Sequence, residues 1–235
     1  MIDEPGFEIL YEEGPCLVVN KPPGVLTQAP PGIDSLEVRI KEFYRRRLDR
    51  SGKVYLAVLH RLDRPVSGAM VFARHVRAAR RLADQFEART VEKVYWACVA
   101  GRVVPESGTW RDTLRKIPDR PQAEIVADDH PEGRAAVLHY RTLSHADWGT
   151  CLEIQLETGR THQVRVQAAS RGWPVLGDER YGSAAPFGSQ FEDARLRTIA
   201  LHARRLAFRH PMSRQPVDVT APPPLAWQDL GFELD

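Results

Sequence analysis

Cysteine and long apolar runs are scarce in this chain of 235 residues. The three cysteines, Cys16, Cys98 and Cys151, stand far apart in apolar stretches, so we expect buried free thiols rather than disulfides or a metal site. No apolar run is long enough to span a membrane, and the acidic start, M-I-D-E-P-G, lacks the basic and apolar regions of a signal peptide. We therefore expect a protein of the reducing cytoplasm with no membrane partner.

Lysine is also scarce, whereas arginine is abundant, and the formal net charge is only +2. Guanidinium groups offer forked donors that match phosphate, and they also stack on bases. Arginines cluster at 45–47, between 77 and 89, and at 204–205, which favours basic patches that contact nucleic acid. A genome rich in G and C, which encodes arginine wherever a surface cation is tolerated, explains the same composition equally well.

The organisation of the chain is that of an ordinary globular protein, with 43% hydrophobic and 27% charged residues. Strand-like runs alternate with only a few helical patterns, without a regular βαβ order, an internal repeat or an interdomain linker. We predict a single domain, 1–235, of the α+β class, in which a largely antiparallel mixed sheet is flanked by a few helices and loops.

Three helices are expected. The first follows Asp34, a candidate N-cap, the second is amphipathic over 76–89, and the third is capped by Thr161 and ends at Gly172. The polar region 105–134 is expected to form loops with a short strand at most. Strands are expected at 7–11, 16–19, 54–59, 69–73, 93–99, 135–143, 151–157 and 201–210. The strand at 69–73 is expected to be buried on both faces, and the strands at 135–143 and 151–157 are expected to form a hairpin. The helix over 76–89 is expected to turn its apolar residues inward, namely Val76, Ala79, Leu82, Ala83 and Phe86.

One stretch combines a carboxylate with permanent cations: Asp63 stands among His60, Arg61 and Arg64. Nearby opposite charges keep a carboxyl group ionised. An ionised aspartate suits a nucleophile, a base or a structural salt bridge, and taken alone the salt bridge is the commoner case.

Three further residues are notable for their positions. Arg165 projects from the first turns of the expected third helix, where the helix dipole disfavours a cation unless a carboxylate lies nearby. Tyr95 carries a polar tip on a strand, 93–99, whose faces are both largely apolar. Lys21 lies in N-K-P-P-G-V-L-T-Q, expected to be a rigid loop, where a lysine contacts a phosphate or, more commonly, water.

Several blocks follow one another in a fixed order. They are L-V-V-N-K-P-P-G at 17–24, H-R-L-D at 60–63 followed by S-G at 67–68, K-V-Y-W-A-C-V-A-G at 93–101, G-R-T-H-Q-V-R-V at 159–166, G-D-E-R-Y-G at 177–182, and L-H-A-R-R-L-A-F-R-H-P at 201–211. Together they resemble the RluA-type family of RNA pseudouridine synthases, from about Phe7 to Val219. Many members carry an N-terminal S4-type domain. The catalytic blocks begin at once here, so we expect the catalytic domain only.

Three places depart from the usual residues of that family. Val66 stands where threonine is commoner, residues 68–71 replace a more aliphatic run, and Gln167 and Ala168 replace histidine and leucine. None of these changes falls on Asp63, Tyr95 or Arg165. They concern the choice of substrate more than the reaction.

The resemblance implies a pseudouridine synthase fold with a central active-site cleft. It also implies an isomerase that converts uridine to pseudouridine in structured ribosomal or transfer RNA, flips the base from its stack, and uses no metal or other cofactor. By resemblance Asp63 is the catalytic aspartate, which attacks the ribose or removes its 2′ proton. Arg165 pairs with it, and Tyr95 stacks on the uracil and assists in removing the C5 proton.

Arg61 resembles the family residue that occupies the space left by the flipped base. The other candidates for RNA binding are His60, Arg64, Arg160, Lys93 and Lys21, although the ring of His60 is expected to make structural hydrogen bonds. We expect a monomer whose partner is structured RNA.

Two other functions are compatible with parts of the sequence. One is an RNA-binding or RNA-chaperone protein on the same scaffold with little catalysis, against which the intact set of Asp63, Tyr95 and Arg165 speaks. The other is a hydrolase with an aspartate nucleophile, which would need Asp178 or His162 as its second catalytic group.

Overall fold

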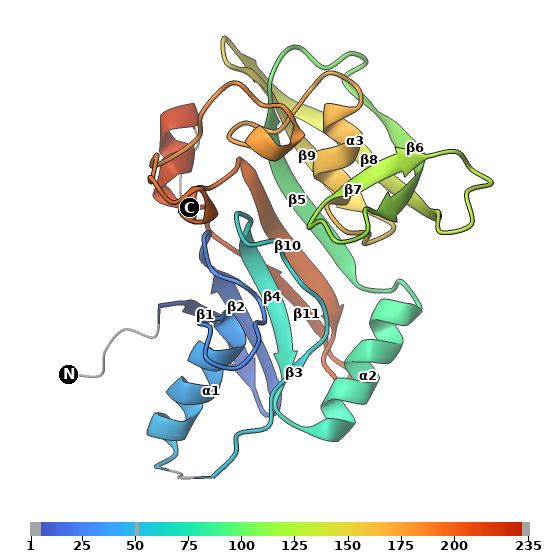
Figure 1. The fold of residues 1–235 in the computed structure, drawn as a ribbon. Coiled ribbons are helices and arrows are strands. Elements are labelled where there is room, and N and C mark those ends of the chain that lie inside the picture. Colours follow the sequence, from blue (N-terminus) through green and yellow to red (C-terminus); the bar gives the residue numbers. More distant parts are fainter. Residues whose placement is uncertain (1–5, 50–51, 232–235) are drawn as a thin grey trace. The chain divides into compact units, whose positions relative to one another are not determined.

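The computed structural model describes residues 6–49 and 52–231 (Figure 1). It divides the chain into two compact units. Unit 1 contains the described residues of Met1–Glu92, Asp193–Leu196 and Ala203–Asp235, and unit 2 contains Lys93–Glu192 and Arg197–His202. The single domain expected for 1–235 stays a prediction, and each unit is described by itself.

The sheet of unit 1 has the strand order β1 (Glu8–Glu13), β2 (Cys16–Lys21), β4 (Ser67–Ala73) and β10 (Leu201–Arg209). The short β3 (Ala57–Val58) pairs with β4, and β11 (Pro216–Thr220) pairs with β10. The helices are α1 (Leu36–Arg47), α2 (Val76–Glu87) and the 3-10 helix η3 (Leu225–Leu230).

β4 is the centre of unit 1, because every one of its residues is buried. Val71 of β4 packs with Leu82 of α2 and Leu206 of β10 in one hydrophobic cluster. At the start of the strand, Gly68 has φ +120°, and a Cβ there would collide with the backbone of Ala203. The S-G pair therefore lets another strand approach closely, and the expectation of a strand buried on both faces is confirmed.

Three local predictions in unit 1 are wrong in detail. α1 is capped by Ser35, whose Oγ accepts a hydrogen bond from Val38 N at 3.3 Å. Asp34, the expected cap, pairs with the Arg39 guanidinium instead. The strand expected over 54–59 shortens to β3. On α2 the expected inward residue Val76 is 64% exposed, because the buried face is centred on Ala78 and Leu82.

The sheet of unit 2 has the order β5 (Glu92–Val99), β9 (Gly149–Leu156), β8 (Arg134–Ala146), β6 (Ser107–Lys116) and β7 (Ala123–Val126). Each pair is antiparallel. The helix α3 (Gln163–Ala169) contributes Val166 to a small cluster with Leu114, Ala123 and Ala136 of this sheet. The 3-10 turn η1 (Glu179–Tyr181) belongs to this unit, whereas η2 (Ala194–Leu196) belongs to unit 1.

The prediction of loops over 105–134 is wrong, because β6 runs for ten residues there. β6 pairs with β8 from Ser107 to Leu114 and buries Trp110 and Leu114, while most of its other residues are charged or small and face outward. Its hydrogen bonds come from a strand that lies later in the chain. The polar outward residues hide the strand from a reading of local hydrophobicity.

The α+β class with a largely antiparallel sheet is confirmed. All three cysteines are free and buried, as predicted. None of the helices in the described ranges is long and apolar enough to cross a membrane.

Candidate active site

The loop that carries Asp63 is cross-linked to the loop that follows β2, on both sides of the aspartate. On one side, the Thr27 hydroxyl donates to Leu62 O at 2.9 Å and accepts from Leu62 N at 3.2 Å. On the other, Gly24 N donates to Arg64 O at 2.8 Å, and Arg64 Nε donates to Gly24 O at 2.8 Å. The backbone of both neighbours of Asp63 is therefore held in place.

Lys21 adds a third connection from the interior. Its side chain is fully buried at the end of β2, and Nζ donates to the carbonyl oxygens of Pro22 (2.9 Å), Val25 (2.7 Å) and Arg64 (3.2 Å). Burial lowers the pKa of Lys21 to about 7, and the negative charge of Asp63 opposes that shift. The expectation of an exposed loop lysine is wrong. A phosphate contact is untested, and these contacts support a structural role.

His60 connects the same loop to β4 and α2. Its Nε2 accepts a hydrogen bond from Val71 N at 3.0 Å, and its ring stacks on Phe86 with the centroids 4.9 Å apart. A nitrogen that accepts a hydrogen bond carries no proton, so this ring is neutral in this arrangement. These contacts are the structural hydrogen bonding that the sequence predicts for His60.

Arg61 differs from its neighbours, since its side chain is exposed. Among residues 6–49 and 52–231 it has no hydrogen bond or ion pair. A guanidinium group in this state is available to an external ligand.

In unit 2, Tyr95 lies on β5 opposite Ile154 of β9 and is 8% exposed. Lys93, two residues earlier, places Nζ beside Gly159, 3.7 Å from where a Cβ of that glycine would lie. Arg160, which follows Gly159, is partly buried, and its Nε donates to Ala135 O at 2.9 Å. The blocks 93–101 and 159–166 thus meet in this unit.

Arg165 is held by a buried carboxylate. Its Nε donates to Asp178 Oδ2 at 2.6 Å and its Nη2 to Asp178 Oδ1 at 2.8 Å. The two side chains are only 5% and 1% exposed. The Tyr181 ring lies 5.0 Å from the guanidinium carbon. Asp178 therefore neutralises the positive charge near the start of α3, where the helix dipole alone disfavours a cation.

The block G-D-E-R-Y-G supplies both partners of Arg165. Gly177 has φ +80°, and a Cβ on it would lie 2.6 Å from Thr198 O, so only glycine fits beside Asp178. The Tyr181 hydroxyl accepts from Ala123 N at 2.9 Å and lies 2.8 Å from Nδ1 of His162. Asp178 and His162, the two groups that a hydrolase would need, are thus bound to Arg165 and to Tyr181.

The start of α3 differs from the prediction. The N-cap is His162, in the left-handed conformation with φ 54° and without a side-chain cap, and Thr161 does not cap the helix. The Oε1 atom of Gln163 instead accepts from Arg160 N at 3.0 Å and from the Thr158 hydroxyl at 2.8 Å. A side chain inside the helix therefore binds the strand-to-helix connection.

Two residues of the site were not recognised in these roles from the sequence. Thr27 lies inside the block N-K-P-P-G-V-L-T, and Asp178 inside G-D-E-R-Y-G, so the blocks marked both positions without stating their contacts. Asp63 belongs to unit 1 and Tyr95 and Arg165 to unit 2. That Asp63, Tyr95 and Arg165 form one catalytic site stays a prediction.

The fold is that of RNA pseudouridylate synthase domains. Two solved structures are similar over nearly the whole chain. The human RNA pseudouridylate synthase domain containing 4 has a TM-score of 0.76 at 23% identity, covering 96% of this chain and 94% of that one. The human RNA pseudouridylate synthase domain containing 1 has a TM-score of 0.74 at 25% identity, covering 97% and 88%.

The sequence comparisons identify the family. The RNA pseudouridylate synthase family model matches residues 15–170. An uncharacterized RNA pseudouridine synthase of Chloroflexus aurantiacus is 38% identical over 92% of this chain and 65% of that protein. The ribosomal large subunit pseudouridine synthase D of Xanthomonas campestris is 37% identical over 97% and 69%. The dual-specificity RNA pseudouridine synthase RluA of Vibrio vulnificus is 34% identical over 89% and 80%.

The chain therefore belongs to the RNA pseudouridylate synthase family, and its resemblance to RluA-type enzymes is confirmed. It spans about two thirds of the length of the Chloroflexus and Xanthomonas relatives, 65% and 69% respectively.

Proposed function

We propose that this chain converts uridine to pseudouridine in structured RNA, with Asp63 as the catalytic aspartate. The observation that carries the proposal is the double restraint of the Asp63 loop, at Leu62 by Thr27 and at Arg64 by Gly24 and Lys21. A catalytic carboxylate must be held within a fraction of an ångström of its productive position. A solvated surface salt bridge needs no such support.

The reaction is an isomerisation in which nothing is oxidised. The bond between ribose C1′ and uracil N1 breaks, the base turns, and C5 bonds to C1′ while its proton is lost and N1 gains one. Asp63 either attacks the ribose or removes its 2′ proton. In this proposal Arg165, whose Nε and Nη2 are bound to Asp178, directs another of its five N–H groups toward Asp63.

The remaining site residues would act on the RNA. Tyr95 stacks on the uracil and assists in the loss of the C5 proton. Arg61, an exposed cation, occupies the space of the flipped base, whose unstacking costs a few kcal/mol. Arg64, Arg160 and Lys93 remain candidates for phosphate contacts. We place the enzyme in the cytoplasm as a monomer that uses no cofactor, with ribosomal or transfer RNA as its substrate.

The test is to express wild type and Asp63→Asn in cells that lack their own pseudouridine synthases and to map pseudouridine in total RNA. We expect wild type to add sites that Asp63→Asn does not. Asp147→Asn, an exposed aspartate in the turn between β8 and β9, is the matched control and should behave as wild type. Identical maps for wild type and Asp63→Asn would overturn the proposal. RNA binding without new sites would favour an RNA chaperone.

A further inference from the structure

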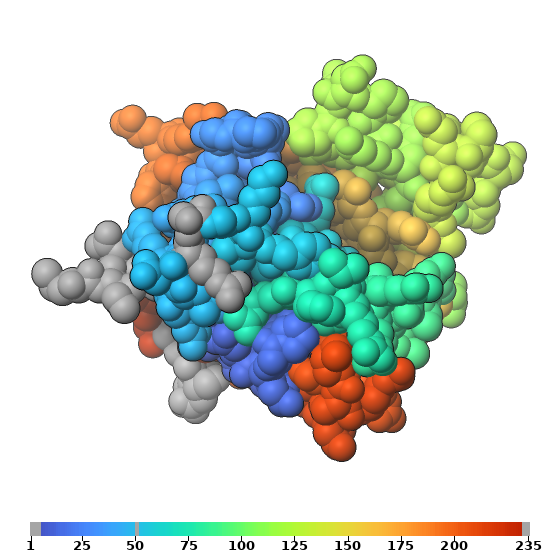
Figure 2. Space-filling view, turned by 90° about the horizontal axis from the view of Figure 1, so that it is seen from below, coloured from blue at the N-terminus to red at the C-terminus, as the bar shows by residue number. Residues whose placement is uncertain are grey.

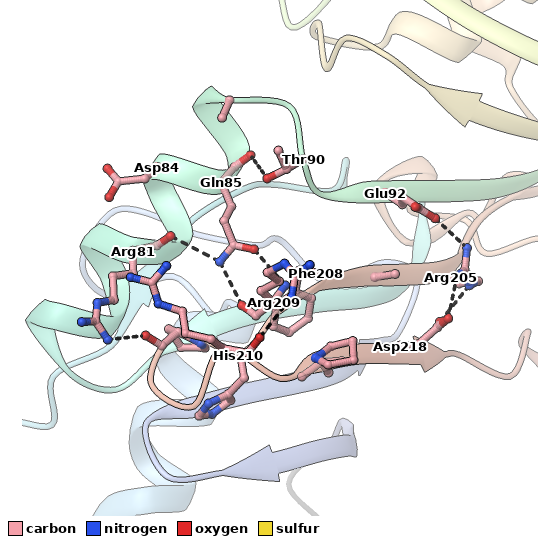
Figure 3. A pocket seen from close by; sticks show the side chains of 16 residues that line it. Arg81, Asp84, Gln85, Thr90, Glu92, Arg205, Phe208, Arg209, His210 and Asp218 are labelled. Atoms are coloured by element: carbon pink, nitrogen blue, oxygen red, sulfur yellow. Dashed lines mark hydrogen bonds and ion pairs between the residues drawn. The ribbon is translucent and has the colours of Figure 1, made fainter.

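A second basic site lies in unit 1, between α2 and the end of the block 201–211. It is a surface cavity of about 580 Å³ between α2 and the hairpin formed by β10 and β11 (Figure 3). Four arginines, Arg81, Arg205, Arg209 and Arg214, line it. The proposed catalytic role of Asp63 makes no use of any of them.

The charges of this cavity are unevenly balanced. Arg205 is neutralised by Asp218 at 2.6 Å and by Glu92 at 3.0 Å. Arg81 donates to Pro211 O at 2.8 Å, and Arg209 donates to the carbonyl oxygen of Arg214 at 3.4 Å. Within the described ranges, neither Arg81, Arg209 nor Arg214 has a carboxylate partner. The remaining acid of the lining, Asp84, points away from Gln85 and Arg209 in Figure 3.

The positive charges also lie close enough to repel one another. The pKa of Arg81 is lowered by partial desolvation and by the charges of Arg77 and Arg214. An anion placed among cations that repel one another lowers their electrostatic free energy.

The hairpin turn that presents Arg214 is built rigidly. His210 N donates to Gln215 O at 2.8 Å, and Arg214 N donates to His210 O at 3.0 Å. The His210 side chain, 3% exposed, accepts from Ser213 N at 3.0 Å and places Nε2 3.2 Å from Glu13 O. Figure 2 shows the red-orange turn beside the blue β1–β2 turn and the green α2.

Within this turn Arg214 adopts the left-handed conformation, with φ 67°. This conformation is unfavourable for a residue that has a Cβ, and glycine or asparagine would adopt it at lower cost. Residues held in such conformations cluster at functional sites. Of the three cavity arginines without a carboxylate partner in the described ranges, Arg214 is the one with this backbone conformation.

Gln85 fixes the other wall of the cavity. Its side-chain amide donates to Arg209 O at 2.9 Å and accepts from Arg209 N at 2.8 Å, which ties α2 to the end of β10 (Figure 3). The next residue, Phe86, stacks on His60. α2 therefore contacts the Asp63 loop with one residue and lines the cavity with its neighbours.

We propose that Arg81, Arg209 and Arg214, with Arg77 beside them, bind phosphate groups of the RNA backbone outside the site that holds the target uridine. The RNA partner rests on the proposed function. Guanidinium forks match phosphate oxygens, and contacts of this kind increase affinity without reading sequence. The cavity thus increases the affinity for RNA by contacts that do not involve the flipped base.

The test compares RNA binding by wild type, Arg81→Ala/Arg214→Ala and a control, Arg39→Ala/Arg141→Ala, whose arginines pair with Asp34 and Glu153. The probes are a transfer RNA transcript and a ribosomal RNA fragment at several salt concentrations. For the cavity variant we expect Kd to rise about tenfold and the magnitude of the slope of log K against log salt to fall by about two, one for each arginine removed. The control variant should resemble wild type. Unchanged Kd and slope would overturn the proposal.

Arg214→Gly separates binding from folding. Glycine suits the left-handed position, so the midpoint of urea unfolding should rise while RNA affinity falls. An RNA affinity equal to or above that of wild type would remove Arg214 from the RNA site, whatever the unfolding midpoint does. Inorganic phosphate is a second probe: binding as tight as that of RNA would mark a site for the free anion and overturn the RNA assignment.

The outcome is independent of catalysis. If wild type forms no pseudouridine but the cavity variant loses RNA affinity, the cavity stands and the proposed reaction falls. If pseudouridine forms and the affinities are equal, the cavity falls alone.

Discussion

Lys21 places an ammonium group where no solvent reaches it, hydrogen-bonded to Arg64 O in the loop of Asp63. Its three carbonyl acceptors replace water, but the positive charge is still costly to bury. The balance makes Lys21 both a positioning residue for the Asp63 loop and a titrating group near neutral pH.

The stability of the protein should therefore rise with pH through this group. The pKa of Lys21 falls from 10.5 to about 7 on folding. Below about pH 7 both states hold the proton and the cost of burial is fully present. Between these values the unfolded state binds more protons, so the free energy of unfolding rises, by up to about 1.4 kcal/mol per pH unit. Lys21→Met should lack this contribution.

Urea unfolding of wild type and Lys21→Met at intervals between pH 6 and pH 10 measures the contribution of Lys21. This range covers most of the interval between its folded and unfolded pKa values. The difference between the two free energies carries the slope, because other titrating groups cancel. Two parallel profiles would contradict the prediction.

Asp178 is the second residue whose charge the interior depends on. Asp178→Asn leaves the buried guanidinium of Arg165 without its anion, which should lower the free energy of unfolding by about 3 kcal/mol. The control is Glu153→Gln, which breaks the exposed ion pair with Arg141 and should cost less than about 1 kcal/mol. Denaturant unfolding measures the free energy of unfolding of both variants. Equal losses would show that the buried pair of Arg165 and Asp178 stabilises the protein no more than an exposed pair does.

At the scale of elements, two loops are made into one support. The loop after β2 and the loop before β4 share the hydroxyl of Thr27, which donates to and accepts from the backbone of Leu62. A strand end alone would not place Asp63, because a loop without such bonds samples several conformations.

Thr27→Val keeps the shape of the side chain and removes both bonds. We expect the free energy of unfolding to fall by about 1–2 kcal/mol and kcat to fall while KM for RNA changes little, because the loss is one of position. Thr27→Ser keeps the hydroxyl and should retain kcat. Steady-state kinetics of pseudouridine formation distinguish them, and equal kcat values for the valine and serine variants would exclude the positioning role.

At the scale of the whole molecule, all three cysteines lie on strands of the sheets and are buried with them. Cys16 lies on β2, Cys98 on β5 and Cys151 on β9, and all three are buried. Burial raises the pKa of Cys16 to about 12, and burial together with the hydrogen bond between the Cys98 and Cys151 thiols raises the pKa of Cys98. The reactive thiolate forms of Cys16 and Cys98 are therefore rare at neutral pH.

The native protein should consequently resist a thiol reagent, whereas the urea-unfolded protein should react at all three thiols. The released chromophore of a disulfide reagent counts them, with glutathione as the control for reagent activity. Rapid labelling of the native protein would show that at least one of the buried strands opens readily.

The sequence by itself determined features whose cause is local or contained in a block. The buried strand β4, the hairpin of β8 and β9 and the free cysteines follow from runs of apolar residues and alternation. The family follows from ordered blocks. The cation conflict at Arg165 could also be seen in advance, since the helix dipole acts within one turn.

Only the tertiary structure decided which groups resolve these conflicts. Asp178 reaches Arg165 from 13 residues away, and Thr27 reaches Leu62 from 35 residues away. Gln85 holds Arg209 across 124 residues. Local periodicity says nothing about such partners, because hydrogen bonds and ion pairs form between groups that folding brings within about 3 Å, whatever their separation along the chain.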